Sequence, residues 1–261
     1  AISGIKDKEY TGKPVTQNIV IKNGNVVLDE GTDYTVSYSA NTKVGTVEVT
    51  ITGTGSYFGE IKSSFDILPA KQQIQKLETR FKGFFIDWAQ KGSATGYEIE
   101  YSSNADFKDS TVKKLTANKP DTLTISGLTA GNKYYVRVRS YTNVGENVYY
   151  GAWSDSKNVT AAKYDITKSA ISGISTKTYT GKNITQSVKV KYNGKTLKSG
   201  TDYTVSYSNN KKVGTATVKI TGKGQYGGTV SKTFKINPAK QKIQKLTAKS
   251  KAFFIDWAQK G

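Results

Sequence analysis

The sequence predicts an all-β protein made of tandem small β-sandwiches in an elongated array. Apolar and polar residues alternate along short segments such as Tyr34–Tyr38 and Val47–Ile51, with the period of two that half-buried strands show. The nine residues GTDYTVSYS at 31–39 recur unchanged at 200–208, and the sequence on either side of them also repeats at the same offset of 169 residues. A solenoid repeat is about 20 to 50 residues long. The longer period therefore indicates two different small domains in alternation.

The repeat divides the chain into four segments. We expect a first sandwich at 1–69, a different sandwich at 70–163, a repeat of the first at 164–238, and the opening strands of a truncated second copy of the different sandwich at 239–261. The stretches LPAKQ and NPAKQ follow the two repeat copies and predict short, stiff linkers. A lone hairpin is only marginally stable. We therefore expect a second chain to shelter the last segment through a chain–chain contact.

The composition restricts the chemistry of the chain. It has 39 Lys and Arg against 20 Asp and Glu, a formal net charge of +19, and no His, Cys or Met. Without His the commonest general base and metal ligand are missing, and without Cys there is no thiolate nucleophile. We therefore expect no enzyme, no catalytic residue, no metal site and no cofactor. The charge fits either a solvated coat of lysines or weak contact with polyanions.

The two repeat copies share one order of motifs. In the second copy this order is YTGK, GTDYTVSYSNN, VGTATVKITGKGQYGGT and FKI, between Tyr179 and Ile236. The first copy carries it between Tyr10 and Ile67, and departs from it at Phe58 and Glu60. The motif order resembles the bacterial Ig-like repeats of surface proteins from Gram-positive gut Firmicutes. That resemblance implies an extracellular location, at the bacterial cell surface or secreted.

The segment at 70–163 has a different set of motifs. Trp88 stands in an early predicted strand, GYEIEYS occupies 96–102, and Leu128 precedes Tyr134 by six residues, the spacing of a tyrosine corner. YVRVRSY and WS follow further along. Together these features resemble a fibronectin type III domain. The resemblance implies a spacer and recognition scaffold that has no catalysis of its own.

Two groups of side chains in this segment are candidates for function. Glu98 and Glu100 are predicted to face Arg137 and Arg139 across neighbouring strands, which we interpret as a cross-strand charge ladder and not as a catalytic carboxylate pair. Aromatic residues on a sheet face are typical of sugar-binding platforms and protein hot spots, and the alternative is ordinary packing against the arginines. The candidate ligand-facing aromatics are Tyr135, Tyr141, Tyr149, Tyr150 and Trp153.

These observations predict a non-catalytic stalk, spacer or adhesion segment of a large bacterial cell-surface or secreted protein. Two alternatives stay open: a module that binds a glycan or a host protein, and an accessory region of a secreted hydrolase whose catalytic domain lies elsewhere. The expected partners are cell-wall polyanions or glycans and a host surface protein. We expect no specific nucleic acid, because the lysines form no block. We expect no membrane span, because no apolar run approaches the roughly 20 residues required.

Overall fold

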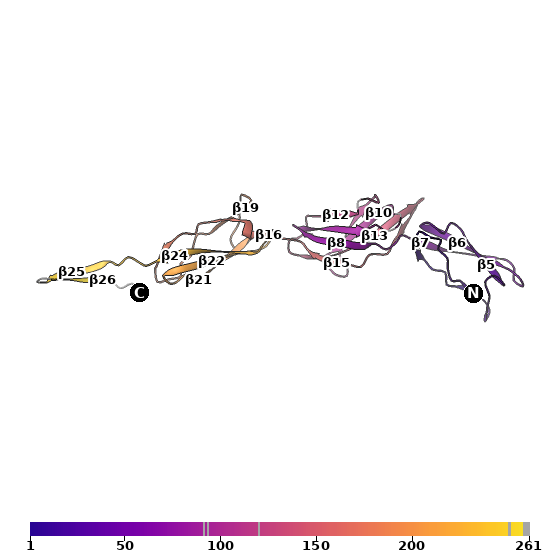
Figure 1. Ribbon diagram of the computed structural model, residues 1–261, viewed down its shortest axis with the longest axis horizontal. Coiled ribbons are helices and arrows are strands. Elements are labelled where there is room, and N and C mark those ends of the chain that lie inside the picture. The colour runs from indigo at the N-terminus through magenta and orange to yellow at the C-terminus, as the bar shows by residue number, and fades with distance from the viewer. Residues whose placement is uncertain (91, 93, 120, 250–251, 258–261) are drawn as a thin grey trace. The chain divides into compact units, whose positions relative to one another are not determined.

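The structure, a computed structural model, describes residues 1–90, 92, 94–119, 121–249 and 252–257. Within these residues every element is a strand except one short 3-10 helix, η1 (Ile166–Lys168). The strands form the sheets of tandem β-sandwiches (Figure 1), so the predicted all-β fold class is confirmed. No helix in the described part of the chain is long and apolar enough to cross a membrane.

The contacts within the chain divide it into two compact units, Ala1–Ala162 and Lys163–Gly261. The first unit contains two sandwiches, which we call the first module (1–69) and the middle module (70–162). The second unit contains the third module (163–238), which repeats the sequence of the first, and the segment that follows it.

The first module is a sandwich of two sheets. The larger sheet has the order β2 (Lys8–Glu9), β7 (Glu60–Leu68), β6 (Gly45–Gly53), β5 (Tyr34–Tyr38), and the smaller has the order β1 (Ile2–Ser3), β3 (Val20–Asn23), β4 (Val26–Val27). β2 runs parallel to β7, and the other neighbours are antiparallel. The alternation along β6 places Val47, Val49 and Ile51 in the core, with Thr46 and Glu48 exposed.

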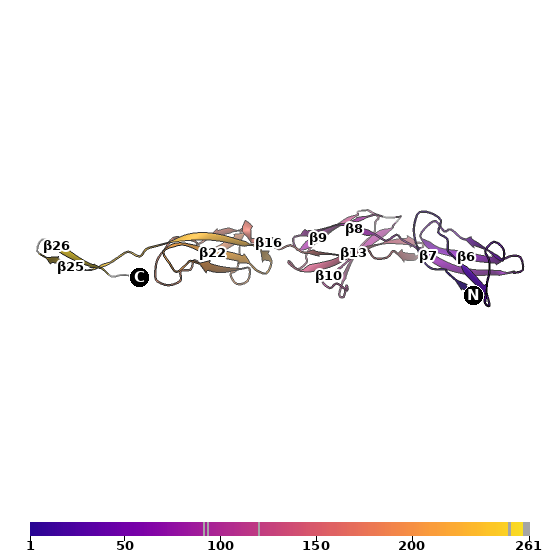
Figure 2. The ribbon, with the colours of Figure 1, turned by 60° about the horizontal axis from the view of Figure 1, so that its bottom comes forward.

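The middle module also has two layers, with β8 and β9 in one layer and β10 and β13 in the other (Figure 2). One sheet has the order β12 (Thr122–Ile125), β9 (Gly83–Ala89), β8 (Gln73–Arg80); the other has the order β11 (Thr111–Leu115), β10 (Gly96–Ser102), β13 (Lys133–Val144), β14 (Asn147–Tyr150), and β15 (Lys157–Thr160) also pairs with β13. Trp88, Tyr97 and Val138 are fully buried between the sheets. The Thr129 N–H donates to the Tyr134 hydroxyl (3.1 Å), which forms the predicted tyrosine corner.

The third module repeats the sheets of the first and adds one pair of strands. Its sheets have the orders β18 (Lys177–Thr178), β24 (Thr229–Asn237), β22 (Gly214–Gly222), β21 (Tyr203–Ser208) and β17 (Ala170–Ser172), β19 (Lys189–Tyr192), β20 (Lys195–Thr196). The added pair is β16 (Tyr164–Asp165), which runs parallel to β23 (Tyr226–Gly227). β16 lies at the end of the module where the chain enters it (Figures 1 and 2).

The chain after the third module forms a two-stranded hairpin. It consists of β25 (Ile243–Lys249) and β26 (Ala252–Trp257), which are antiparallel. Leu246 and Phe253 on these strands are 64% and 68% exposed. The predicted segment 239–261 includes residues 250, 251 and 258–261, which lie outside the described residues. That a second chain covers the hairpin stays a prediction.

Candidate functional site

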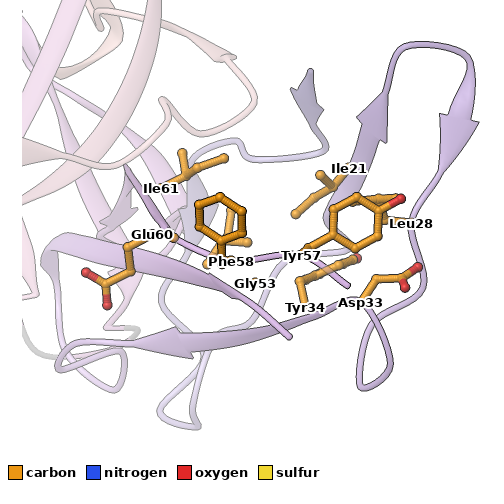
Figure 3. A pocket seen from close by; sticks show the side chains of 11 residues that line it. Ile21, Leu28, Asp33, Tyr34, Gly53, Tyr57, Phe58, Glu60 and Ile61 are labelled. Atoms are coloured by element: carbon orange, nitrogen blue, oxygen red, sulfur yellow. The ribbon is translucent and has the colours of Figure 1, made fainter. Parts of the chain in front are cut away.

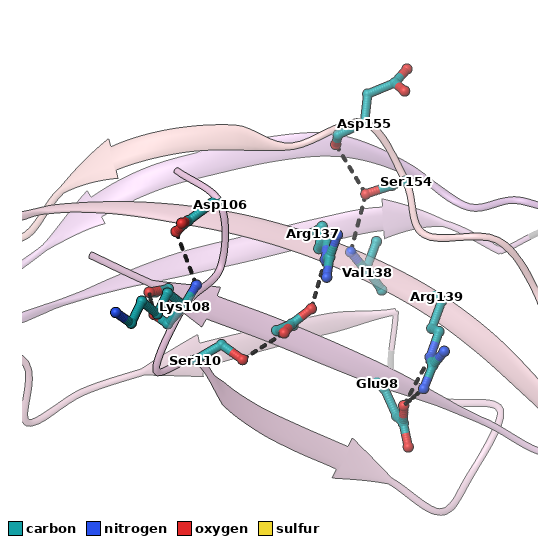
Figure 4. A network of polar contacts seen from close by, with 11 residues as sticks. Glu98, Asp106, Lys108, Ser110, Arg137, Val138, Arg139, Ser154 and Asp155 are labelled. Carbon is teal, nitrogen blue, oxygen red and sulfur yellow. Dashed lines mark hydrogen bonds and ion pairs between the residues drawn. The ribbon is translucent and has the colours of Figure 1, made fainter. Parts of the chain in front are cut away.

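The outer face of β10 and β13 carries a row of ion pairs that follows the strand register. Glu98 lies directly opposite Arg139, and Glu100 lies opposite Arg137. Arg139 donates to Glu98 Oε2 through Nε (2.9 Å) and Nη2 (2.7 Å), and Arg137 Nε donates to Glu100 Oε2 (2.6 Å) (Figure 4). Ser110 Oγ donates to the other carboxylate oxygen of Glu100 (2.5 Å). This row is the cross-strand charge ladder that the sequence pattern predicts.

Both carboxylates of the ladder are buried, although they lie on the outer face of the sheet. Glu98 and Glu100 are each only 7% exposed, and every residue of β10 is buried. Tyr97, Ile99 and Tyr101 on the opposite face of the strand belong to the core. Buried carboxylates need partners, because an unpaired buried charge is costly. The arginines therefore hold this sheet together from its outer side.

Three aromatic rings stack with the two arginines to form a continuous column. The Arg137 guanidinium lies 4.1 Å from the centroid of the Phe107 ring and 4.7 Å from that of Trp153. The Arg139 guanidinium lies 4.4 Å from the centroid of Trp153 and 4.1 Å from that of Tyr150. Trp153 thus contacts both arginines. We call these five residues the arginine–aromatic column.

The loop that supplies Phe107 has an unusual backbone. Phe107 has a φ of 61° and Asp109 a φ of 53°. This left-handed region is rare for a bulky residue such as Phe107 and more common for aspartate. Ser102 Oγ donates to the carbonyl oxygen of Lys108 (2.7 Å), which ties the loop to the end of β10. Phe107 could not be predicted as a member of the column, because no alternation or turn motif in the sequence marks its position.

The five candidate ligand-facing aromatics take different places in the structure. Tyr150 and Trp153 meet in the arginine–aromatic column. Tyr135 shares the outer face with Arg137 by strand alternation and lies opposite Ser102 of β10.

The remaining two candidates are engaged elsewhere. Tyr141 is 2% exposed, and its hydroxyl donates to the Leu115 carbonyl oxygen (3.2 Å). The hydroxyl of Tyr149 hydrogen-bonds with Thr46 Oγ1 of the first module (2.9 Å). Tyr150 and Trp153 thus lie in the column, Tyr141 is buried on the outer face of the sheet, Tyr149 contacts the first module, and Tyr135 lies on the outer face outside the column.

The linker between the first and middle modules is built into the fold. Gln72 is completely buried, and its side-chain amide donates to the Ala70 carbonyl (2.6 Å) and to Ser140 Oγ (3.0 Å). Ser140 Oγ in turn donates to the Ala70 carbonyl (3.1 Å). A buried polar side chain with its hydrogen bonds satisfied favours one local geometry. The linker therefore belongs to the edge of the middle module.

Lys71 links both modules from the same linker. Its backbone N–H donates to Glu9 Oε1 of the first module (3.0 Å), and its ammonium donates to Asp155 Oδ1 of the middle module (2.8 Å). The hydrogen bond from Lys71 holds the pKa of the Asp155 carboxyl below its usual value. The linker residues 69–72, with Glu9, Ser140 and Asp155, form what we call the joint.

The comparisons with known proteins identify one domain. Residues 78–151 match the family model of the fibronectin type III domain, so the middle module contains a domain of this family. Domains of this family are generally non-catalytic and are typical of extracellular proteins.

The chain has distant and partial likenesses to solved structures. The chain is similar to a β-1,2-glucanase from Parabacteroides distasonis, with 19% identity, a TM-score of 0.29, and coverage of 44% of this chain and 17% of that chain. It is also similar to the chicken interferon gamma receptor alpha chain, with 12% identity, a TM-score of 0.30, and coverage of 46% of this chain and 67% of that chain. The chain thus spans about a sixth of the glucanase. The search of curated proteins gave no match.

Proposed function

We propose that this chain is a non-catalytic stalk, spacer or adhesion segment of a large bacterial cell-surface or secreted protein. The fibronectin type III domain at 78–151 supports a non-catalytic or accessory role. The bacterial setting is supported by the resemblance of the repeated module to bacterial Ig-like repeats. The role of such a segment is to set the distance and direction between the domains that it joins.

The joint is the observation that carries this proposal. Neighbouring domains on one chain move relative to one another unless their interface restrains them. Here Gln72 is buried in the middle module, and Lys71 is bonded to a carboxylate on each side. A spacer benefits from such a restraint, because a freely hinged junction transmits neither distance nor direction.

The arginine–aromatic column also supports a spacer over a recognition platform. Sugar-binding surfaces offer the flat face of an aromatic ring to the ligand. The centroid of the Trp153 ring lies 4.7 Å from the Arg137 guanidinium and 4.4 Å from the Arg139 guanidinium, so the ring already stacks against groups of its own chain. The column stabilises the sheet with groups that a recognition site would leave free.

A distance measurement across the joint tests the proposal. The chain has no cysteine, so Asn25→Cys in the first module and Lys113→Cys in the middle module, both at exposed positions, provide two unique sites for spin labels. We expect pulsed electron paramagnetic resonance spectroscopy to give a narrow distribution of distances between the two spin labels. Gln72→Ala removes the buried amide and is expected to broaden that distribution.

The matched control for this experiment is the neighbouring glutamine. Gln73→Ala changes an exposed side chain of the same type and should leave the distances unchanged. A broad distribution in the double-cysteine chain itself would refute the restrained joint. Equal effects of the two alanine variants would show that Gln72 has no special part in it.

A further inference from the structure

Three tyrosine side chains meet at one end of the third module. Tyr164 lies in β16, Tyr192 ends β19, and Tyr226 begins β23. The ring centroid of Tyr164 lies 5.0 Å from that of Tyr192 and 5.4 Å from that of Tyr226, and the last two centroids are 5.7 Å apart. The planes of these three pairs meet at 45°, 32° and 70°, so the rings are not stacked flat on one another. They form angled walls.

The three rings line an open pocket of about 330 Å³. This volume lies within the range of about 300–1,000 Å³ that is usual for small-molecule sites. Tyr226 is 6% exposed and belongs to the core, whereas Tyr164 and Tyr192 are half-buried. The other residues that line the pocket are all polar: Asn193, Lys195, Asp202 and Gln225. Aromatic surface and hydrogen-bonding groups therefore lie together in one hollow.

A tight hairpin brings several of these side chains together. Tyr192 of β19 lies directly opposite Lys195 of β20, and Asn193 and Gly194 form the turn between them. The φ angles of Asn193 and Gly194 are 45° and 80°, which is typical of a two-residue hairpin turn with positive φ at both positions. Directly opposed residues on paired strands have their side chains on the same face of the sheet. The hairpin thus fixes a ring, an ammonium group and an amide beside the pocket.

Asp202 supplies the only carboxylate among the lining residues. Its Oδ2 accepts a hydrogen bond from the Lys198 N–H (2.8 Å), which orients the carboxylate. Burial, together with the negative charge of Asp202, raises the pKa of the Tyr226 hydroxyl. That hydroxyl therefore stays protonated near neutral pH and remains a hydrogen-bond donor.

The three other polar lining residues are not engaged in the fold through their side chains. Asn193, Lys195 and Gln225 are exposed, and their side chains make no hydrogen bond or ion pair with any residue that the structure describes. An amide side chain both donates and accepts hydrogen bonds, and an ammonium group donates them. The pocket therefore presents a mixture of donors and acceptors to a ligand.

The first module shows that the fold does not require this lining. It keeps Asp33 and Tyr57 at the positions 169 residues before Asp202 and Tyr226, and both line a hollow there (Figure 3). The counterparts of Tyr192, Asn193, Lys195 and Gln225 are Asn23, Gly24, Val26 and Ser56. None of these four lines that hollow. The hairpin of the first module nevertheless has the same register, with Asn23 opposite Val26.

We propose that the pocket of the third module is a binding site for a neutral saccharide of one or two sugar rings. The C–H face of a sugar ring packs against the rings of Tyr164 and Tyr192, and its hydroxyl groups bond to Asp202 and to the amides of Asn193 and Gln225. The lining carries one carboxylate and one ammonium group, so it has no net charge that would select an anionic sugar. This site is a further function, and it does not depend on the spacer role proposed above.

A titration followed by nuclear magnetic resonance tests the proposal on the whole chain. The probes are neutral disaccharides of N-acetylglucosamine, glucose, galactose, mannose and xylose, each at up to about 10 mM, because a site of this size is expected to bind with a Kd of about 1 mM or below. At least one probe should shift the amide signals of residues 192–195 and 225–226. Sulfated and uronic acid disaccharides should bind no more tightly than the neutral ones.

The variants take their side chains from the first module. Tyr192→Asn with Lys195→Val should weaken binding by about tenfold or more, because a packed ring and a hydrogen-bond donor are lost. Asn193→Gly removes the amide and keeps a residue that favours the positive φ of the turn, so it should weaken binding without unfolding the module. The matched control is Asn23→Ala, an exposed residue of the corresponding hairpin in the first module, which should leave binding unchanged.

Every result of this experiment decides the proposal. If no neutral probe shifts the named signals, the pocket is not a saccharide site and the proposal is wrong. If a probe binds equally well to the chain and to the Tyr192→Asn, Lys195→Val variant, the binding site lies elsewhere and the assignment is overturned. If only the acidic disaccharides bind, and salt abolishes their binding, the lysines of the chain account for the effect and the neutral-sugar site is refuted.

Discussion

Trp153 has two cationic neighbours within the middle module. Its indole ring stacks with Arg137 and Arg139, and these arginines neutralise the two buried carboxylates of β10. The ring therefore stabilises the ion pairs indirectly, by holding both guanidinium planes and by excluding water from them. One residue thereby influences both Glu98 and Glu100 without touching the core between the sheets.

We expect Trp153→Ala to lower the free energy of unfolding of the middle module by about 2 kcal/mol. Two cation–π contacts of about 0.5–1 kcal/mol each are lost, together with part of the apolar area of the ring. Urea denaturation monitored by circular dichroism measures the change. The control is Val112→Ala, an exposed residue of β11, which should change stability by less than about 0.5 kcal/mol. Equal effects of both variants would mean that the column contributes no stability.

Residues 163–169, which we call the strap, lead into the third module through a single short turn, η1 (Ile166–Lys168). The ionised carboxylate of Asp165 accepts hydrogen bonds from the hydroxyl and from the backbone N–H of Thr167. These hydrogen bonds, the side-chain bond first, lower the pKa of the Asp165 carboxyl from its ordinary value. Ionised Asp165 thus stabilises η1, the turn that carries Ile166 into the core.

The pKa shift of Asp165 predicts how the attachment of the strap depends on pH. The pKa of the Asp165 carboxyl is lower in the folded chain than in the unfolded chain, where it is about 3.9. The stabilisation is therefore fully present at a pH above the unfolded pKa, and it is lost as the pH falls through the folded pKa. Amide exchange of Thr167 should therefore become faster relative to the core amides in strongly acidic solution. Asp165→Asn should abolish this dependence, because an amide does not titrate. An unchanged dependence in that variant would assign it to another group.

The strands and the ion-pair ladder were predictable from sequence, and the strap and the joint were not. Alternation along Val47–Ile51 fixes which side chains face the core, and the register then brings Glu98 opposite Arg139. Ile166 sits in a turn without alternation, and its groove comes from residues far along the chain. Gln72 lies in a polar linker, where burial depends on a partner at Ser140.

The burial of Tyr141 could not be predicted from strand alternation, for a different reason. It continues the outward positions of Arg137 and Arg139 along β13, and alternation alone would expose it. Instead the Lys114 ammonium lies 4.3 Å from its ring centroid, and the Tyr150 ring lies 6.1 Å from it. Long side chains from neighbouring strands thus bury an outward residue, an effect that no single-strand pattern contains.

For the whole molecule, the charge of +19 is the property that acts beyond any one module. Lysines occur in the described parts of all three modules, so the positive field is distributed along the sequence. We propose that this field gives weak contact with the polyanions of a bacterial cell wall. Such contact is screened when the Debye length falls from about 10 Å at 0.1 M salt to about 3 Å at 1 M.

A salt titration tests the proposed contact with polyanions. We expect the chain to bind isolated Gram-positive cell wall and immobilised heparin weakly at low salt, and to be released from both by about 1 M salt. Trp153→Ala should leave this binding unchanged as long as the variant remains folded. Binding to one glycan that survives high salt and requires Trp153 would instead identify a recognition module.

The parallel pairing of the first and last strands of the larger sheets determines how each repeated module would bear a pulling force. In the first module, β2 near the start pairs with β7 at the end, and in the third module β18 pairs with β24 in the same way. If the two ends of such a module are pulled apart, the paired strands slide along their length, and their hydrogen bonds are loaded in shear at the same time. Antiparallel terminal strands would instead open one bond after another from one end, as a zipper does. A segment that tethers a domain against flow or movement is mechanically stronger with the first arrangement.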